Sequence, residues 1–238
     1  MLTVFIVGQK YKRIGILGGM GPEATAKLYL KIIRIFQNNY GAKYDSDYPE
    51  IMIYNLPLPD VVEKVDQSSK IKDMLVKGVQ KLESLGVDFI AIPCNTVNYF
   101  LPEMRDNVSV PILSILEETA KEVNKFGLKK VAVLGTEMTI STGIYQNVLP
   151  SINLIVPKLE QQQEITGVIL NILSGKKFNT DLQRIQTIIQ EFKIDGAEKV
   201  ILGCTELPLL IKKNNATIDT IEVLAKAIVK KSINVEEK

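Results

Sequence analysis

Histidine is absent from this chain of 238 residues, and the chain has only two cysteines. The absence of histidine excludes the Ser–His and Cys–His nucleophile systems. It also removes a ligand on which most zinc and other transition-metal sites depend. Proton transfer would therefore fall to Cys, Asp, Glu, Lys or Tyr.

Long blocks of one charge and long apolar runs are missing as well. The 29 Lys and Arg residues nearly balance the 27 Asp and Glu residues, and they are interspersed, whereas a nucleic-acid surface needs clustered cations. No apolar run approaches the ~18–20 residues of a membrane helix. Met1–Gly8 is apolar but short and lacks a basic segment, so we expect an edge strand or an upstream extension rather than a signal peptide. We therefore expect a cytoplasmic protein without nucleic-acid or membrane partners.

Short β-branched runs alternate with longer amphipathic stretches along the whole chain. Runs typical of buried strands are Arg13–Leu17, Ile51–Asn55, Asp88–Pro93, Lys130–Leu134, Asn153–Val156 and Lys199–Leu202. Helical spacing is found in Glu23–Phe36, Ser69–Leu85, Glu117–Phe126, Glu160–Leu173 and Leu182–Phe192. This alternation predicts an α/β fold with parallel sheets flanked by helices.

A weak internal repeat suggests that the fold has two similar halves. The segment 12–18 resembles 129–135, and the segment 86–96 resembles 196–206. Both cysteines of the chain, Cys94 and Cys204, fall at the same place in the second pair. Similarity among α/β strands is common, because they are all rich in Val and Ile. If the repeat is real, a site between the halves would lie at the carboxyl ends of the strands, where both cysteines are found.

Each cysteine follows a predicted strand and precedes small polar residues and a predicted helix, which begins near Val97 or Leu207. A thiol at a helix N-terminus has its thiolate stabilised by free N–H groups and the helix dipole. Two such thiols suit the inversion of a stereocentre, in which one base removes a proton and an acid returns one to the opposite face. A buried apolar role and a disulfide are the alternatives, and nothing resembles a C-x-x-C redox motif.

A glycine-rich segment, Gly15–Thr25, follows the first predicted strand and opens a helix. Its spacing does not match the G-x-G-x-x-G dinucleotide fingerprint. Pro22 suits a first helical turn, and the glycines allow the backbone to approach a ligand closely. The segment is compatible with a tight turn and with a carboxylate-binding loop.

Three motifs carry a resemblance to a known family. Gly18–Thr25, Pro93–Thr96 and Gly203–Pro208 resemble the aspartate/glutamate racemase family, in particular its aspartate racemase branch, and the similarity extends from Arg13 onward. The resemblance implies two pseudo-symmetric α/β domains with the active site in the cleft between them. It also implies racemisation of aspartate or glutamate without pyridoxal phosphate or another cofactor, with Cys94 and Cys204 as the two bases, and a homodimer.

The resemblance also suggests a pocket and a division of the chain. The expected substrate-binding residues are Met20, Gly21, Tyr54, Asn55, Asn95, Thr96, Thr136, Lys176, Thr205 and Glu206. Lys158 is a weaker alternative to Lys176, and we interpret Glu23 as a carboxylate that complements a helix dipole. The first domain is expected to comprise 1–112 plus 213–238, and the second 113–212.

Two positions depart from the family pattern. Members usually have His where this chain has Asn98, and Arg where it has Val61. That Arg resembles a group that binds the side-chain carboxylate of the substrate, and Val61 has no donor for it. The sequence therefore leaves the substrate open, with a hydantoin racemase, a maleate isomerase and a non-catalytic protein that binds a small anion as alternatives.

Overall fold

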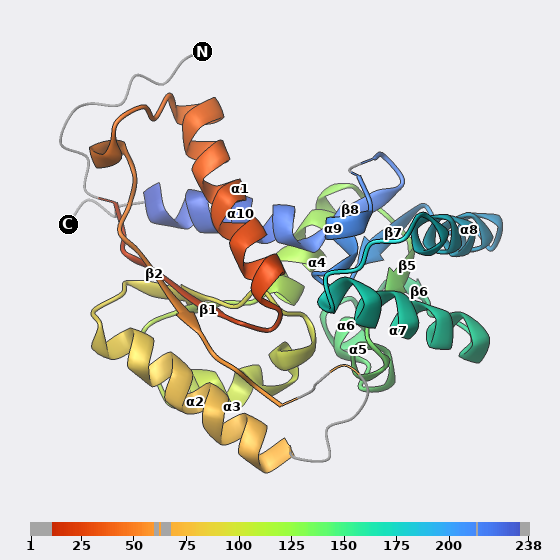
Figure 1. Ribbon diagram of the computed structural model, residues 1–238, viewed down its shortest axis with the longest axis horizontal. Coiled ribbons are helices and arrows are strands. Elements are labelled where there is room, and N and C mark those ends of the chain that lie inside the picture. The colour runs from red at the N-terminus through yellow and green to blue at the C-terminus, as the bar shows by residue number, and fades with distance from the viewer. Residues whose placement is uncertain (1–10, 60–61, 63–67, 213, 234–238) are drawn as a thin grey trace.

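A computed structural model describes residues 11–59, 62, 68–212 and 214–233, and it contains two parallel four-stranded sheets (Figure 1). The first sheet has the order β2-β1-β3-β4 and the second has the order β6-β5-β7-β8. The first comprises β1 (Ile14–Gly18), β2 (Ile51–Asn55), β3 (Phe89–Ala91) and β4 (Ile112–Leu113). The second comprises β5 (Lys130–Leu134), β6 (Asn153–Ile155), β7 (Lys199–Leu202) and β8 (Thr217–Asp219). The two orders are the same, which confirms the predicted fold class with two similar α/β halves.

Helices flank both sheets. The described helices of the first half are α1 (Pro22–Tyr40), α2 (Ser68–Ser84), α3 (Leu101–Arg105), α4 (Ile115–Lys125) and the 3-10 turns η1 (Asp45–Asp47) and η2 (Thr96–Phe100). Those that follow are α5 (Glu137–Ser141), α6 (Ile144–Val148), α7 (Leu159–Leu173), α8 (Asn179–Ile194), α9 (Leu207–Leu210) and α10 (Thr220–Ile233).

Among the described residues, three hydrophobic cores hold these layers together. One core packs β1 and β3 on α2 and α3, and another packs β5 and β7 on α7 and α8. The central core is shared, because α1, α4 and α10 lie between the inner faces of both sheets. Figure 1 shows α1 and α10, from opposite ends of the chain, side by side. Burial of this apolar surface is the main force that holds the halves together.

Several elements differ from the sequence-based expectation. β4 has two residues and β8 has three, so neither is long enough to show a strand period. The chain after Cys94 forms the 3-10 turn η2 rather than a regular helix, and the helix after Cys204 has only four residues. The helix start predicted near Leu207 is confirmed, whereas the helix predicted from Val97 is replaced by this 3-10 turn and the five-residue α3, so neither thiol lies at the start of a long helix.

The chain crosses between the halves near its end. β8 pairs with β7 in the second sheet, whereas α10 packs against α1 and α4. The domain division at 112/113 and 212/213 stays a prediction. The expectation for Met1–Gly8 lies outside the described residues. Among the described helices, none is both long enough and apolar enough to pass through a bilayer.

Candidate active site

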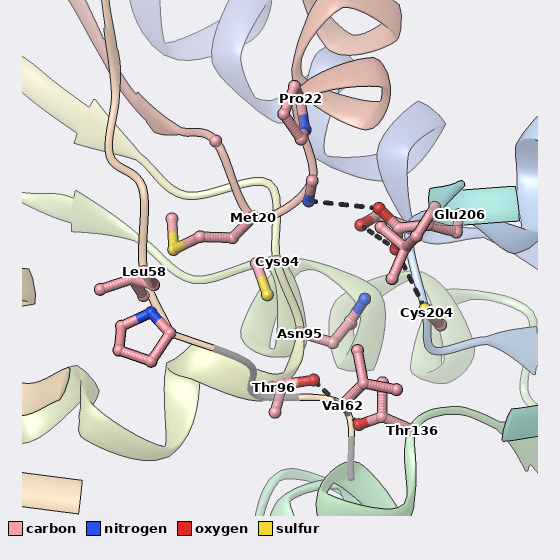
Figure 2. Close-up of a pocket in the computed structure, with 15 residues that line it drawn as sticks. Met20, Pro22, Leu58, Val62, Cys94, Asn95, Thr96, Thr136, Cys204 and Glu206 are labelled. Atoms are coloured by element: carbon pink, nitrogen blue, oxygen red, sulfur yellow. Dashed lines mark hydrogen bonds between the residues drawn. The ribbon is translucent and has the colours of Figure 1, made fainter. Parts of the chain in front are cut away.

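A cavity of about 170 Å³ lies at the carboxyl ends of strands from both sheets (Figure 2). The segments that line it follow β1, β2 and β3 in the first half and β5 and β7 in the second. Its described lining consists of Gly19, Met20, Gly21, Pro22, Leu58, Pro59, Val62, Cys94, Asn95, Thr96, Thr136, Leu173, Cys204, Thr205 and Glu206. This volume is similar to that of a dry cavity of about 150 Å³ that accepts benzene, so a single small ligand would fill it.

The glycine-rich turn after β1 forms one wall of the cavity. Gly19 has a φ of +95°, a conformation that favours glycine, and a Cβ there would lie 2.6 Å from the backbone oxygen of Leu56. The N–H of Gly19 donates to Thr25 Oγ1 at 3.0 Å, and the N–H of Gly21 donates to Glu206 Oε1 at 3.2 Å. Both N–H groups have partners within the protein, which favours a turn and close packing over a carboxylate-binding loop.

Cys94 is a free thiol in the loop that follows β3, and it is 6% exposed. Burial raises the pKa of its thiol from 9.0 to about 12, and the charge of Glu206 adds a smaller increase, while the backbone N–H groups of Val97 and Thr96 and the Thr96 hydroxyl lower this pKa. Asn98 supports the same loop, because its side-chain N–H donates to the Cys94 carbonyl oxygen at 2.7 Å. The Ser114 hydroxyl donates in turn to Asn98 Oδ1 at 2.9 Å. Donors from Val97 and Thr96 thus face the sulfur of Cys94, while Asn98 and Ser114 hold the loop that carries it.

Cys204 is also a free and buried thiol, but a carboxylate faces it. Its Sγ donates to Glu206 Oε2 at 3.0 Å, and the Thr205 hydroxyl donates to the same oxygen at 3.1 Å. Burial raises the pKa of Cys204 well above 9.0, and the charge of Glu206 raises it further. Burial also raises the pKa of the Glu206 carboxyl, which is only 5% exposed. A negative charge on Cys204 is therefore disfavoured from two sources.

These pKa directions correct the expectation that helix N-termini would stabilise both thiolates. The N–H groups do face the sulfurs and do lower the pKa values, but the loss of hydration outweighs them. The sequence could not reveal this balance, since it depends on how completely the loops exclude water.

A cluster of three buried hydroxyl groups joins the two halves beside the cavity. Thr96 Oγ1 lies 3.0 Å from Thr136 Oγ1 and 3.1 Å from Thr139 Oγ1, and the latter two are 3.0 Å apart. Thr136 also begins α5, since its hydroxyl oxygen accepts a hydrogen bond from the Thr139 N–H. Thr96 and Thr136 line the cavity, so their hydroxyls can turn a proton or a lone pair toward a ligand.

Most of the residues expected at the pocket do lie together. Cys94, Cys204 and seven of the expected binding residues line the cavity: Met20, Gly21, Asn95, Thr96, Thr136, Thr205 and Glu206. Three do not. Asn55 is exposed, Tyr54 packs its ring 4.3 Å from Lys81 Nζ, and Lys176 is an exposed residue of the turn after α7.

The surroundings of Lys176, and of the two other charged residues considered from the sequence, place their side chains outside the cavity lining. The Lys176 backbone N–H donates to the Asn171 carbonyl, and the next residue, Lys177, forms an ion pair with Glu23 across the two halves. Glu23 thus has a partner in the second half in addition to its place at the start of α1. The Lys158 side chain is exposed where α7 begins.

An apolar part of the wall was missed by the sequence reasoning. Leu58, Pro59 and Val62 come from the segment after β2, and Leu173 comes from the end of α7. Val62 is 8% exposed and packs in the core of the second half. The sequence offered one signal for Leu58, Pro59 and Val62, which is that they lie close to Val61 in the chain. No feature of the sequence marks Leu173 as a cavity residue. Val61 itself lies outside the described residues.

Charged and metal-binding groups are scarce at this site. Glu206 is the one charged side chain among the described residues of the lining. No group of three His, Cys, Asp or Glu side chains that could hold a metal ion occurs in the described parts of the chain. A cation that would pair with a ligand carboxylate is thus missing from the described wall.

Comparisons with known proteins give matches over most of the chain. A sequence model of Asp/Glu/hydantoin racemases matches residues 17–228. The broad-specificity amino-acid racemase RacX of Bacillus subtilis is 38% identical over 91% of this chain and 96% of its own length.

Solved structures give the same result. An aspartate racemase homologue from Pyrococcus horikoshii is 31% identical, with a TM-score of 0.77 over 93% of this chain and 99% of that one. The aspartate racemase of Picrophilus torridus is 29% identical, with a TM-score of 0.79 over 93% of this chain and 94% of that one.

Proposed function

Because the chain belongs to the Asp/Glu/hydantoin racemase family, we propose that it is an amino-acid racemase in which Cys94 and Cys204 are the two acid/base groups. The observation that carries the proposal is that two free, buried thiols, one from each half, border the same small cavity. Cα inversion needs a proton acceptor on one face and a proton donor on the other. Cysteine supplies both forms, as thiolate and as thiol.

The reaction begins when one thiolate removes the Cα proton of the bound amino acid and becomes a thiol. The electron pair of the broken C–H bond delocalises into the substrate carboxylate. The thiol of the other cysteine then gives its proton to the opposite face of Cα and becomes a thiolate. Atoms and charge balance, because one proton leaves the substrate and another replaces it.

The charge that develops on the substrate carboxylate needs fixed donors. The hydroxyls of Thr96 and Thr136 and the amide of Asn95 line the cavity and can donate to it. Their geometry is set before the substrate binds, since the hydroxyls already form a bonded cluster that spans the two halves. Such preorganised donors lower the barrier without having to reorient during the reaction.

The substrate also solves the problem of the high thiol pKa. An amino acid carries an ammonium group, and a positive charge in a cavity of low dielectric constant stabilises a nearby thiolate. Cys94 is the thiol that this positive charge ionises more readily, because N–H and O–H donors already face its sulfur. We therefore assign Cys94 as the thiolate in the first complex and Cys204, bonded to Glu206, as the thiol.

Aspartate or glutamate as substrate stays a prediction, and one observation favours a second candidate. A second carboxylate on the substrate would find no cation among the described lining residues, and it would share the cavity with Glu206. The apolar wall formed by Met20, Leu58 and Leu173 suits a neutral side chain instead. Homodimer formation and a cytoplasmic location also stay predictions.

The test is a racemisation assay by polarimetry or chiral chromatography, with no pyridoxal phosphate added. The panel contains acidic, neutral and basic amino acids, together with a hydantoin and maleate. Inversion of at least one free amino acid would support the proposal. Turnover of maleate or a hydantoin alone, or binding of an amino acid without turnover, would overturn it in favour of the corresponding alternative.

A further inference from the structure

Tyr145 contacts the loops of both cysteines without lining the cavity. It lies on α6 in the second half, is 1% exposed and is the largest fully buried side chain among the described residues. Its hydroxyl donates to Asn95 Oδ1 at 2.7 Å, next to Cys94 in the chain. Its ring packs on Gly203, next to Cys204, so closely that a Cβ on Gly203 would lie 3.0 Å from Tyr145 Cε2. One side chain thus reaches both cysteine loops.

A second connection runs from Asn95 to the strand that carries Cys204. Asn95 Nδ2 donates to Thr220 Oγ1 at 3.3 Å, and the Thr220 hydroxyl donates to the Leu202 carbonyl oxygen at 2.9 Å. Thr220 is the first residue of α10 and is fully buried. Asn95 therefore has two partners, Tyr145 and Thr220. Tyr145 contacts Gly203 and Thr220 contacts Leu202, the two residues that precede Cys204.

The directions of these hydrogen bonds follow from chemistry. The Leu202 carbonyl can only accept, so the Thr220 hydroxyl uses its proton there and must accept from Asn95. Only the NH₂ group of Asn95 can donate, which turns Oδ1 toward Tyr145 and makes the tyrosine hydroxyl the donor. These hydrogen-bond directions fix the orientation of the Asn95 amide, and they leave the second N–H of its NH₂ group for a ligand.

We propose that Tyr145 and Thr220 are positioning residues that hold the Cys94 loop against the Cys204 loop, so that both sulfurs address the same Cα. The inference rests on the proposed function. Proton transfer depends steeply on distance, and a misplacement of about 1 Å can cost about 100-fold in rate. Burial raises the pKa of the Tyr145 hydroxyl, so it stays protonated and remains a donor at every pH at which the enzyme acts.

Two variants test the proposal, Tyr145→Phe and Thr220→Val. Tyr145→Phe keeps the ring on Gly203 and removes only the hydroxyl, and Thr220→Val keeps the shape of the threonine. The matched control is Tyr48→Phe, which removes a hydroxyl where Tyr48 packs against Phe36, on α1 and away from the cavity. For each test variant we expect kcat to fall by about tenfold or more with KM within about threefold of wild type, and the control to match wild type.

Deuterated water separates positioning from a loss of folded protein. A misplaced second thiol returns its proton late, so the first thiol has time to exchange with solvent and to reprotonate the original face. The ratio of deuterated starting enantiomer to inverted product should therefore rise in both variants. A smaller amount of folded enzyme would lower both products in proportion. An unchanged ratio together with an unchanged kcat would overturn the proposal.

The rate at which iodoacetamide alkylates each cysteine, read by mass spectrometry, is the second measurement. Loosening of the loops should raise the rate at Cys94 in Tyr145→Phe but not in Tyr48→Phe. If the wild type racemises nothing while this difference appears, the proposed function fails and the positioning role stands. If the wild type racemises and neither the alkylation rate nor kcat responds, the positioning role fails alone.

Discussion

Cys94 and Cys204 occupy equivalent places in two sheets of the same order, yet their surroundings differ in charge. Around Cys94 the sulfur faces N–H and O–H donors. Around Cys204 the sulfur donates to Glu206, a buried carboxylate two residues further along the chain. The comparison teaches that the repeated fold sets where the thiols lie, whereas neighbouring side chains set which of them loses its proton first. The free enzyme should rest with Cys204 protonated and with Cys94 as the easier thiol to ionise.

Replacement of either cysteine should have the largest effect. General acid/base groups contribute about 10²–10⁴-fold, so Cys94→Ala and Cys204→Ala should each lower kcat/KM for racemisation by about 10³-fold or more. With one thiol left, removal and return of a proton on a single face stays possible. We therefore expect slow Cα–H exchange without inversion, for opposite enantiomers in the two variants, measured by NMR. The idea of two distinct bases fails if both variants exchange the same enantiomer.

The dependence of stability on pH should be the next largest effect. The pKa of Cys94 is raised from 9.0 to about 12 in the folded protein. Above pH 9 the unfolded chain therefore releases a proton that the folded protein keeps, and the free energy of unfolding falls as pH rises toward 12. The loss from one such thiol is about 1.4 kcal/mol per pH unit.

Urea unfolding of wild type and Cys94→Ala at pH 8.5 and 10 measures this difference, since other titrating groups cancel between the two proteins. The wild type should lose more stability than the variant over this range. Parallel losses would mean that burial does not raise the pKa of Cys94.

The role of Glu206 gives a sharper test of the asymmetry. Glu206→Gln removes the negative charge beside Cys204 and keeps an oxygen that can accept from the Gly21 N–H. The pKa of Cys204 should fall, and its alkylation at pH 9 should accelerate several-fold. The change at Cys94 should be smaller, because there the charge of Glu206 is a lesser cause of the raised pKa. An equal acceleration at both sulfurs would remove the asymmetry on which the assignment of Cys94 as the thiolate of the substrate complex depends.

The smallest effect concerns the support of the Cys94 loop. The Ser114 hydroxyl bonds to Asn98 and also accepts from the Glu117 N–H at the start of α4. Ser114→Ala should lower the free energy of unfolding by about 1 kcal/mol. The same measurement on Ser84→Ala, whose hydroxyl is exposed and bonds only to a local carbonyl, should show no loss. A similar loss of stability in both variants would contradict a specific role of Ser114 in supporting the Cys94 loop.

Sequence reasoning was most successful where local patterns determine the structure. The apolar period placed β2, β5 and β7 at their observed bounds, and the repeat around the two cysteines predicted two sheets of one topology. The cysteines and their polar neighbours could be found because they directly follow strands, whose carboxyl ends meet at one edge.

The remaining features depend on contacts between distant segments. Tyr145 has no motif around it, and its position between the loops follows from packing on Gly203. Leu173 reaches the cavity only because α7 ends there. Lys176 was expected at the pocket from the resemblance, yet it is exposed in the turn beyond that helix end. The direction of the thiol pKa values was missed for the same reason, since burial is a property of the assembled halves.

The source of the proton in the inverted product distinguishes two facing thiols from a single base. The measurement is NMR of an early time point, with either enantiomer of an accepted amino acid turned over by the wild-type enzyme in deuterated water. If each face is served by its own sulfur, the inverted product carries deuterium at Cα while the unreacted enantiomer still carries hydrogen, in both directions. A product that retains the original hydrogen would contradict the assignment of Cys94 and Cys204 to opposite faces of one carbon.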